Sequence, residues 1–236
     1  MARHKPATKG GYQRGESTRA AILMAAVEVF GRRGYEGAST RDIAKAAEVN
    51  APAIQYYFDS KEGVYLQCVE HLITLLWQKM GAAVEAAEMA ASDRTSDDQR
   101  LIEAALGILA AVLVTQEDTH YRKAWRAFFD RQQAGPCPPS ATVAFEQKFK
   151  GRIDSVMRQL IARLSGFALE DERTILHAMA LFTQGLAFRA HKPRLATALG
   201  QENVSRSQMM LANDIALTQA RFTLHGLAQR NPSLTR

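Results

Sequence analysis

The stretch from Thr40 to Lys61, TRDIAKAAEVNAPAIQYYFDSK, constrains the fold most strongly because it encodes two short helices joined by a tight turn. Ser39 and Asp42 have the spacing of a capping box, in which side chains satisfy the free backbone amides at a helix start. Asn50 supplies a second cap, and Pro52 is tolerated in a first helical turn because the amide it lacks would be unpaired there. The stretch therefore predicts a helix-turn-helix, a unit suited to entering a DNA groove.

Each of the two predicted helices has an inward and an outward face. On the first, Ile43, Ala44 and Ala47 share the side that packs on another helix. On the second, Ile54 and Phe58 lie four residues apart and are expected to point inward. The outward face is the predicted DNA-reading surface, formed by Pro52, Ala53 and Tyr56 with Gln55 and Tyr57 on its flanks.

The N-terminal quarter carries most of the formal net charge of +6. Residues 1–61 hold ten lysines and arginines against six acids, and residues 1–15 hold four basic residues and no acid. Neutralisation of phosphates supplies most of the non-specific affinity of a DNA-binding protein, and it makes binding salt dependent. Residues 1–15 are therefore expected to form a basic, disordered arm, and the alternative is a terminus that only aids solubility or expression.

An ordered set of residues and the amphipathic helix before it, expected from Ser17 to Arg33 and ending before Gly34, together cover about fifty positions near the N-terminus. The set comprises Thr40, Ile43, Ala44, Ala47, Val49, Asn50, Tyr56, Tyr57, Phe58, Lys61 and Glu62. It resembles the helix-turn-helix signature of TetR-type transcriptional repressors. Downstream, the segment from Arg173 to Arg189 resembles the C-terminal domain of the CecR-like subgroup.

The resemblance implies a division of labour on DNA. Thr40 and Lys61 would lie at helix N-termini beside phosphates, where backbone amides and the helix dipole favour an anion. Phosphate contacts position a protein, whereas base contacts specify the sequence. The residues expected to bind DNA are Thr40, Arg41, Asn50, Ala51, Pro52, Ala53, Gln55, Tyr56, Tyr57 and Lys61.

Two positions depart from the family pattern. Glu48 holds the place in the turn where the family usually has glycine, whose backbone tolerates positive φ. The first residues of the second helix, Ala51 to Ala53, offer no hydrogen bonds where the family often has polar residues. Direct reading then depends on apolar contact with thymine methyl groups and on Gln55 pairing with adenine, with DNA shape contributing. For Tyr56 and Tyr57, the alternative is a half-buried aromatic ring with a wet tip.

The remaining chain predicts helices throughout. Its 236 residues favour two domains, and 47% hydrophobic with 23% charged residues is ordinary for a globular protein. We expect an all-α fold with a three-helix DNA-binding domain at residues 16–62 and a larger effector-binding and dimerisation domain at residues 63–236. A long helix, capped by Asp59 and Glu62, is expected to bridge the two domains. Ser96 and Gln99 are expected to cap a further helix that runs to about Val114. Other helices are expected from Glu117 to Gln133, Thr142 to Leu164, Glu170 to His191 and Val204 to Gln229.

The composition favours a cytoplasmic protein. The longest apolar run, Ala104 to Val114, is shorter than a membrane span, and the basic N-terminus has no apolar segment behind it. The two cysteines, Cys68 and Cys137, argue against a disulfide framework and fit a reducing compartment.

Apolar stripes on the last two long helices predict a homodimer. The interface candidates are Met179, Phe182 and Leu186 on one helix and Ile215 and Phe222 on the other. In the TetR family the corresponding helices form a four-helix bundle between subunits, so a two-fold dimer would read a near-palindromic operator in double-stranded DNA. The alternative is that these stripes fill the core of a monomer.

Aromatic residues in the second domain predict a pocket for an unknown small-molecule effector. The candidate lining residues are Tyr121, Trp125, Phe128, Phe129 and His177, with arginines nearby that suit an aromatic or anionic ligand. The alternatives are core packing for the aromatic stripe and an interface position for His177. A bound effector would favour a conformation whose reading helices are wrongly spaced for the operator.

No motif predicts an enzyme. The chain has no nucleophile elbow and no glycine-rich phosphate loop. Cys68 and His71 lie three residues apart on one helix, but two ligands do not complete a metal site, so no metal or cofactor is expected. The alternative function is an effector-independent DNA-binding protein of nucleoid or architectural type, which would use the same basic flank without a pocket.

Overall fold

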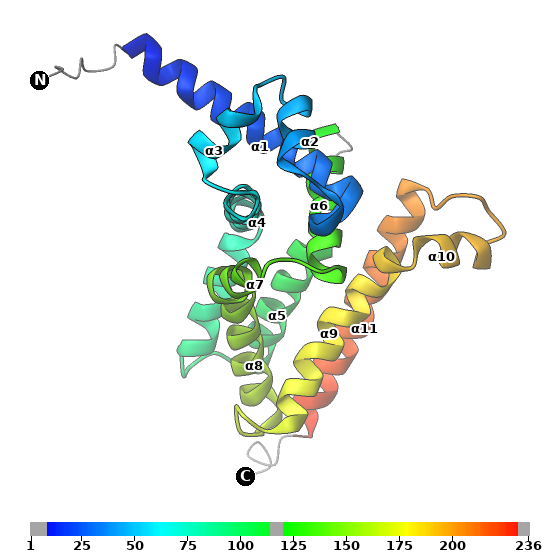
Figure 1. The fold of residues 1–236 in the computed structure, drawn as a ribbon. Coiled ribbons are helices and arrows are strands. Elements are labelled where there is room, and N and C mark those ends of the chain that lie inside the picture. The colour runs from blue at the N-terminus through cyan, green and yellow to red at the C-terminus, as the bar shows by residue number, and fades with distance from the viewer. Residues whose placement is uncertain (1–8, 114–119, 231–236) are drawn as a thin grey trace, which may run out of the picture. The chain divides into compact units, whose positions relative to one another are not determined.

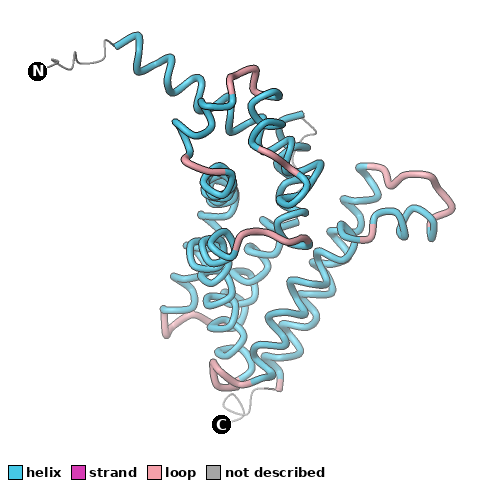
Figure 2. The backbone as a smooth tube through the Cα atoms, in the orientation of Figure 1, coloured by secondary structure: helices cyan, strands magenta, loops and turns pink. Residues whose placement is uncertain are grey.

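The computed structural model describes residues 9–113 and 120–230, except for the side chains of residues 9–14, 120–122, 133–134, 185, 189 and 190. Every regular element in these ranges is a helix, which confirms the predicted all-α fold (Figures 1 and 2). The elements are α1 (Lys9–Gly37), α2 (Thr40–Ala46), α3 (Ala51–Phe58), α4 (Lys61–Ser92), α5 (Asp98–Leu113), α6 (His120–Ala134), α7 (Pro139–Phe145), the π-helical turn η1 (Glu146–Lys150), α8 (Gly151–Ser165), α9 (Glu172–Ala190), α10 (Lys192–Ala198) and α11 (Arg206–Gln229).

The chain divides into two compact units. The first comprises residues 1–75 and 117–149, and the second comprises residues 76–116 and 150–236. The helix α4 therefore contributes its first half to one unit and its second half to the other. The domain boundary expected after residue 62 stays a prediction, because a compact unit need not coincide with a functional domain.

The first unit is built around an aromatic core. Phe30 of α1 meets Tyr65 of α4 edge to face at 4.9 Å between ring centroids, and Tyr65 lies 5.1 Å from Phe128 of α6. All three rings are buried. Aromatic pairs at such distances add to the stability gained from burial alone. The helices α1 and α6, far apart in the sequence, thereby pack along each other.

The helix α1 is longer than the sequence suggested. It begins at Lys9 instead of Ser17, so residues 9–15 of the expected arm are helical; no proline after Pro6 interrupts this part of the chain. It also continues past Gly34, where the backbone turns at φ 71° and ψ 177° before a last turn ends at Gly37. Glycine adopts positive φ with little strain, so the predicted end becomes a kink.

Two predicted helix caps are wrong. The amide of Gly63 donates to Ser60 Oγ at 3.0 Å, so Ser60, not Asp59, caps α4. The amide of Arg100 donates to Asp97 Oδ1 at 2.8 Å, so Asp97 replaces Ser96 as the cap of α5. In each case the true cap is one residue closer to the helix, and its side chain reaches the amide three residues on.

The second unit holds the distal half of α4 against α8. The Arg163 guanidinium donates to the carbonyl groups of Ala90, Ala91, Asp93 and Ser96 at 2.7–3.1 Å, which caps the end of α4. Arg152 donates two hydrogen bonds to the Glu88 carboxylate, and this charged contact lowers the pKa of Glu88. The helix α4 therefore runs unbroken to Ser92 through its alanine-rich part.

The C-terminal helices α9 and α11 lie side by side in the second unit (Figure 1). Their buried faces contain small residues, among them Ala212, Ala216 and Ala220 of α11, which allow close approach. Two elements were not predicted. The expected helix from Thr142 to Leu164 is divided by η1, and α10 begins at Lys192, where Pro193 occupies a first-turn position that proline favours.

Two glycines of α4 give a matched test of this packing. A Cβ added at Gly63 would lie 2.0 Å from the backbone oxygen of Phe58, whereas one added at Gly81 meets no atom within 4 Å. We expect Gly63→Ala to lower the free energy of unfolding by about 1–3 kcal/mol, and Gly81→Ala to raise it by about 0.5–1 kcal/mol. Chemical denaturation measures both changes, and equal effects would contradict the close approach at Gly63.

Candidate nucleic-acid interface

The start of α2 is fixed by a complete capping box. The amide of Asp42 donates to Ser39 Oγ and the amide of Ser39 donates to Asp42 Oδ2, both at 3.1 Å. Arg33 of α1 forms an ion pair with Asp42 at 2.8 Å. The hydrogen bond from the Ser39 side chain, supported by Arg33, holds the pKa of the Asp42 carboxyl below its usual value. This polar cluster ties α2 to α1 and leaves Thr40 at the helix start.

The turn between α2 and α3 contains a residue with positive φ, a conformation that glycine usually adopts. Glu48 has a φ of 56°, which confirms that it takes the place of the expected glycine. The amide of Val49 donates to the carbonyl of Ala44 at 3.0 Å and closes the turn. A left-handed conformation costs a non-glycine residue about 1–2 kcal/mol, so the flanking helix packing must hold this turn in place.

The helix α3 presents the predicted reading face outward. Its cap is Asn50, whose Oδ1 accepts from the amide of Ala53 at 3.1 Å. Ile54 and Phe58 are buried as expected, and the guanidinium of Arg19 lies 5.2 Å from the centre of the Phe58 ring. The orientation of α3 is thus set by two inward side chains and a capped first turn.

The ten residues expected to bind DNA all lie in the first unit, on α2, on α3 and its cap Asn50, and at the start of α4. The exposed ones are Arg41, Asn50, Ala51, Pro52, Gln55 and Tyr56, and the half-buried ones are Thr40, Ala53, Tyr57 and Lys61. Tyr56 is 80% exposed, and its ring meets that of Tyr57 edge to face at 4.9 Å. An aromatic side chain this exposed is not filling a core, so burial does not explain Tyr56.

Tyr35, near the end of α1, is a residue that the sequence did not single out. The Lys61 ammonium lies 4.2 Å from the centre of the Tyr35 ring, at the C-terminal end of α1. No local spacing relates these two positions, because the contact depends on how α1 and α4 pack. An aromatic residue just after a predicted helix end is too common a pattern to have identified it.

The predicted effector residues do not come together within one unit. Trp125 and Phe128 are buried in the first unit, with His71 stacked on Trp125 at 4.9 Å. The half-buried Phe129 lies 6.1 Å from Phe145 in the same unit. His177 belongs to the second unit, and the side chain of Tyr121 lies outside the described residues. Core packing therefore accounts for Trp125 and Phe128, and the effector site stays a prediction.

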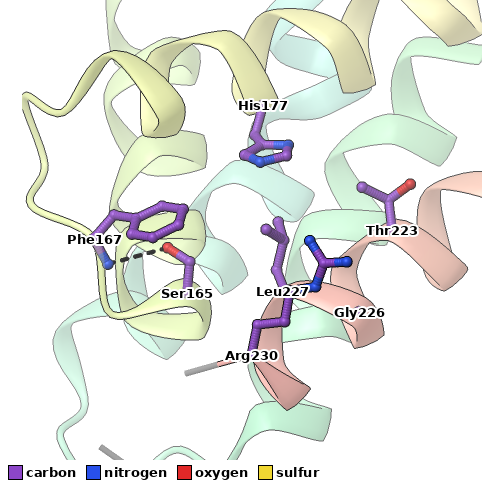
Figure 3. A pocket seen from close by; sticks show the side chains of 7 residues that line it. All are labelled: Ser165, Phe167, His177, Thr223, Gly226, Leu227 and Arg230. Atoms are coloured by element: carbon purple, nitrogen blue, oxygen red, sulfur yellow. Dashed lines mark hydrogen bonds between the residues drawn. The ribbon is translucent and has the colours of Figure 1, made fainter. Parts of the chain in front are cut away.

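His177 lines a shallow hollow of about 250 Å³ in the second unit (Figure 3). The other lining residues are Ser165, Phe167, Thr223, Gly226, Leu227 and Arg230. The hydroxyl of Ser165 donates to the Ile161 carbonyl and accepts from the Phe167 amide, so it is already engaged. Arg230 brings a positively charged side chain to this hollow.

The predicted dimer residues lie on the exposed sides of α9 and α11. Phe222 is 72% exposed, Met179, Leu186 and Ile215 are also exposed, and Phe182 is half-buried. The exposed apolar set further includes Leu176, Met210 and Leu211. Large exposed apolar patches are rare on monomeric proteins, and they usually mark a surface that binds a partner.

The described ranges hold neither a metal cluster nor a membrane-spanning helix. No group of three or more histidine, cysteine, aspartate or glutamate side chains there could hold a metal ion. None of the helices in those ranges has the length and hydropathy to cross a membrane.

Residues 22–68 match the sequence profile of bacterial regulatory proteins of the tetR family. Residues 99–227 match the C-terminal domain of the HTH-type transcriptional dual regulator CecR. The chain is 30% identical over 222 residues to CecR of Shigella flexneri, covering 92% of this chain and 96% of that protein. It is 40% identical over 60 residues to the HTH-type transcriptional repressor NicS of Pseudomonas putida, which is 25% of this chain and 28% of NicS.

Solved structures share the fold at low sequence identity. AibR, in complex with isovaleryl coenzyme A and operator DNA, aligns with a TM-score of 0.60 and 14% identity, covering 86% of this chain and 97% of AibR. A transcriptional regulator from Pseudomonas aeruginosa PAO1 aligns with a TM-score of 0.56 and 16% identity, covering 92% of this chain and 94% of that chain.

Proposed function

Because this chain belongs to the TetR family of bacterial transcriptional regulators, with a CecR-type C-terminal domain, we propose that it is a homodimeric repressor released from operator DNA by a small molecule. The observation that carries the proposal is the outward face of α3. The starts of α2 and α3 are both capped, and both helices lie in the segment that matches the family's DNA-binding region. Binding an operator places its action in the cytoplasm, where the chromosome lies.

On the operator, α3 would enter the major groove and the starts of α2 and α4 would meet phosphates. Gln55 is the exposed residue of α3 whose amide can pair with adenine through two hydrogen bonds. Lys61 and the free amides at the start of α4 offer positive charge to a phosphate. Ala51, Pro52 and Ala53 would contribute apolar contacts, and Tyr56 would reach the sugar-phosphate backbone.

Selection of duplexes from random DNA tests this division between reading and positioning. We expect the wild-type protein to enrich a near-palindromic site. Gln55→Ala should change the preferred base at one position per half-site, at a cost of about 1–3 kcal/mol against the original base. Lys61→Ala should weaken binding to all sequences alike and reduce the salt dependence.

Equal effects of the two substitutions on sequence preference would contradict this division. Failure of the wild-type protein to enrich any sequence, together with a steep salt dependence, would favour the architectural alternative instead.

The exposed faces of α9 and α11 support the proposed dimer. A two-fold axis beside them would pair the faces into a four-helix arrangement and cover Met179, Ile215 and Phe222. A two-fold dimer would then read two half-sites about 34–36 Å apart, one for each copy of α3.

Charge placed on this surface tests the dimer. We expect Phe222→Glu to shift the protein from dimer to monomer, because a buried carboxylate without a partner opposes association. Met89→Glu is a matched control, since Met89 is 60% exposed on α4 and lies outside the proposed interface. Sedimentation equilibrium at micromolar concentration measures both masses, and a monomeric wild-type protein would overturn the dimer.

The proposed effector would bind a conformation that fits the operator poorly. AibR has been crystallised with both isovaleryl coenzyme A and operator DNA, so a protein of this fold holds both kinds of ligand. Phe129 and His177 are the expected effector residues whose described side chains are not buried, and each remains a candidate contact within its own unit. The effector acts only through its different affinity for the two conformations.

A screen for small molecules that raise the melting temperature identifies effector candidates. We expect those that bind to weaken operator affinity in a fluorescence-anisotropy titration. An effector that strengthens operator binding would reverse the proposed direction of control.

A further inference from the structure

The contact between Lys61 and Tyr35 differs in kind from the ion pair that Arg33 forms in the same DNA-binding region. The ammonium lies 4.2 Å from the ring centre, and none of the described carboxylates forms an ion pair with it. Arg33, by comparison, is paired with the Asp42 carboxylate at 2.8 Å. A carboxylate holds a cation but cancels its charge, whereas an aromatic ring holds it and carries no net charge.

The Tyr35 ring is itself fixed from two sides. It stacks on Phe30 at 6.1 Å with 28° between the ring planes, and it meets Tyr65 edge to face at 5.1 Å. Both of those rings are buried in the core of the first unit. The kink at Gly34 directly precedes Tyr35, so the ring belongs to the last short turn of α1. The Tyr35 ring is therefore held in one position by its contacts with the core.

The position of Lys61 on its helix also calls for an explanation. It is the first residue of α4, where the positive end of the helix dipole disfavours a lysine. The same site becomes favourable when an anion binds, because the ammonium and the free helix amides then act on one phosphate. A flexible lysine loses rotamer freedom on making such a contact, and this loss is smaller if its position is already restricted.

We propose that Tyr35 is a positioning residue that holds the Lys61 ammonium at the start of α4 for contact with an operator phosphate. The inference rests on the proposed phosphate contact of Lys61. Tyr35 itself does not touch DNA in this arrangement. Its contribution is the strength of one cation–π contact, which sets the size of the expected effect.

A double-mutant cycle tests whether Tyr35 acts through Lys61. The probe is the highest-affinity duplex that the wild-type protein selects from random DNA, labelled for anisotropy. We expect Tyr35→Leu to weaken binding about two- to fivefold per half-site, and Tyr35→Phe to leave it unchanged. In a Lys61→Met background, Tyr35→Leu should have no further effect, because the cation it positions is gone.

Graded fluorination at position 35 separates this role from packing. Replacing Tyr35 by phenylalanine carrying one, two or three ring fluorines keeps the ring shape but progressively weakens its attraction for a cation. We expect affinity to fall stepwise with fluorine number in the Lys61 protein and to stay constant in the Lys61→Met protein. Melting temperatures measured alongside check that every variant is folded.

Two results would overturn the inference. A Tyr35→Leu effect of the same size with and without Lys61 would mean that Tyr35 acts only through packing. Wild-type affinity and salt dependence in Lys61→Met would mean that there is no phosphate contact to position, since one lost contact lowers the slope of log affinity against log salt by about 0.9. Absence of any selected duplex is a separate outcome, which would refute the proposed operator binding as well.

Discussion

The close approach of Gly63 to the carbonyl of Phe58 is the constraint on which the DNA-binding surface depends. It joins the end of α3 to the start of α4 through a link in which Asp59 takes a φ of 62° and Ser60 caps the following helix. No side chain larger than hydrogen fits at residue 63 without moving backbone. The reading face and Lys61 are thereby held in one rigid geometry, although they belong to different helices.

Around this junction, each helix start is satisfied by one short polar side chain, Ser39, Asn50 or Ser60. Each cap engages one amide and leaves others at the helix start free, which is the physical basis of anion binding there. The charged side chains near these helix starts also favour an anion. The acid at the start of α2 is occupied by Arg33, while Lys61 rests on a neutral ring and keeps its charge for a ligand.

The sequence predicted what depends on neighbours along the chain and missed what depends on packing. The Ser39–Asp42 box, the Asn50 cap, the positive φ at Glu48 and the inward Ile54 and Phe58 all follow from local rules. The contact of Lys61 with Tyr35 and the π-helical turn η1 arise from tertiary contacts, whereas the burial of Trp125 and Phe128 is the core-packing alternative that the aromatic stripe had left open. The two misplaced caps reflect the one-residue ambiguity of polar runs such as Asp59-Ser60 and Ser96-Asp97.

The helix α4 carries the proposed phosphate contact at its first residue and contacts α8 near its other end. It begins with Lys61 and ends where Arg163 binds the carbonyl groups of its last turn and the loop beyond. Near the same end, Arg152 donates hydrogen bonds to the Glu88 carboxylate, and its guanidinium lies over the ring of Trp77. The helix α4 is continuous, and α8 contacts its distal half at both of these places. In the proposed mechanism α4 is the element through which effector binding would change the phosphate contact at its first residue.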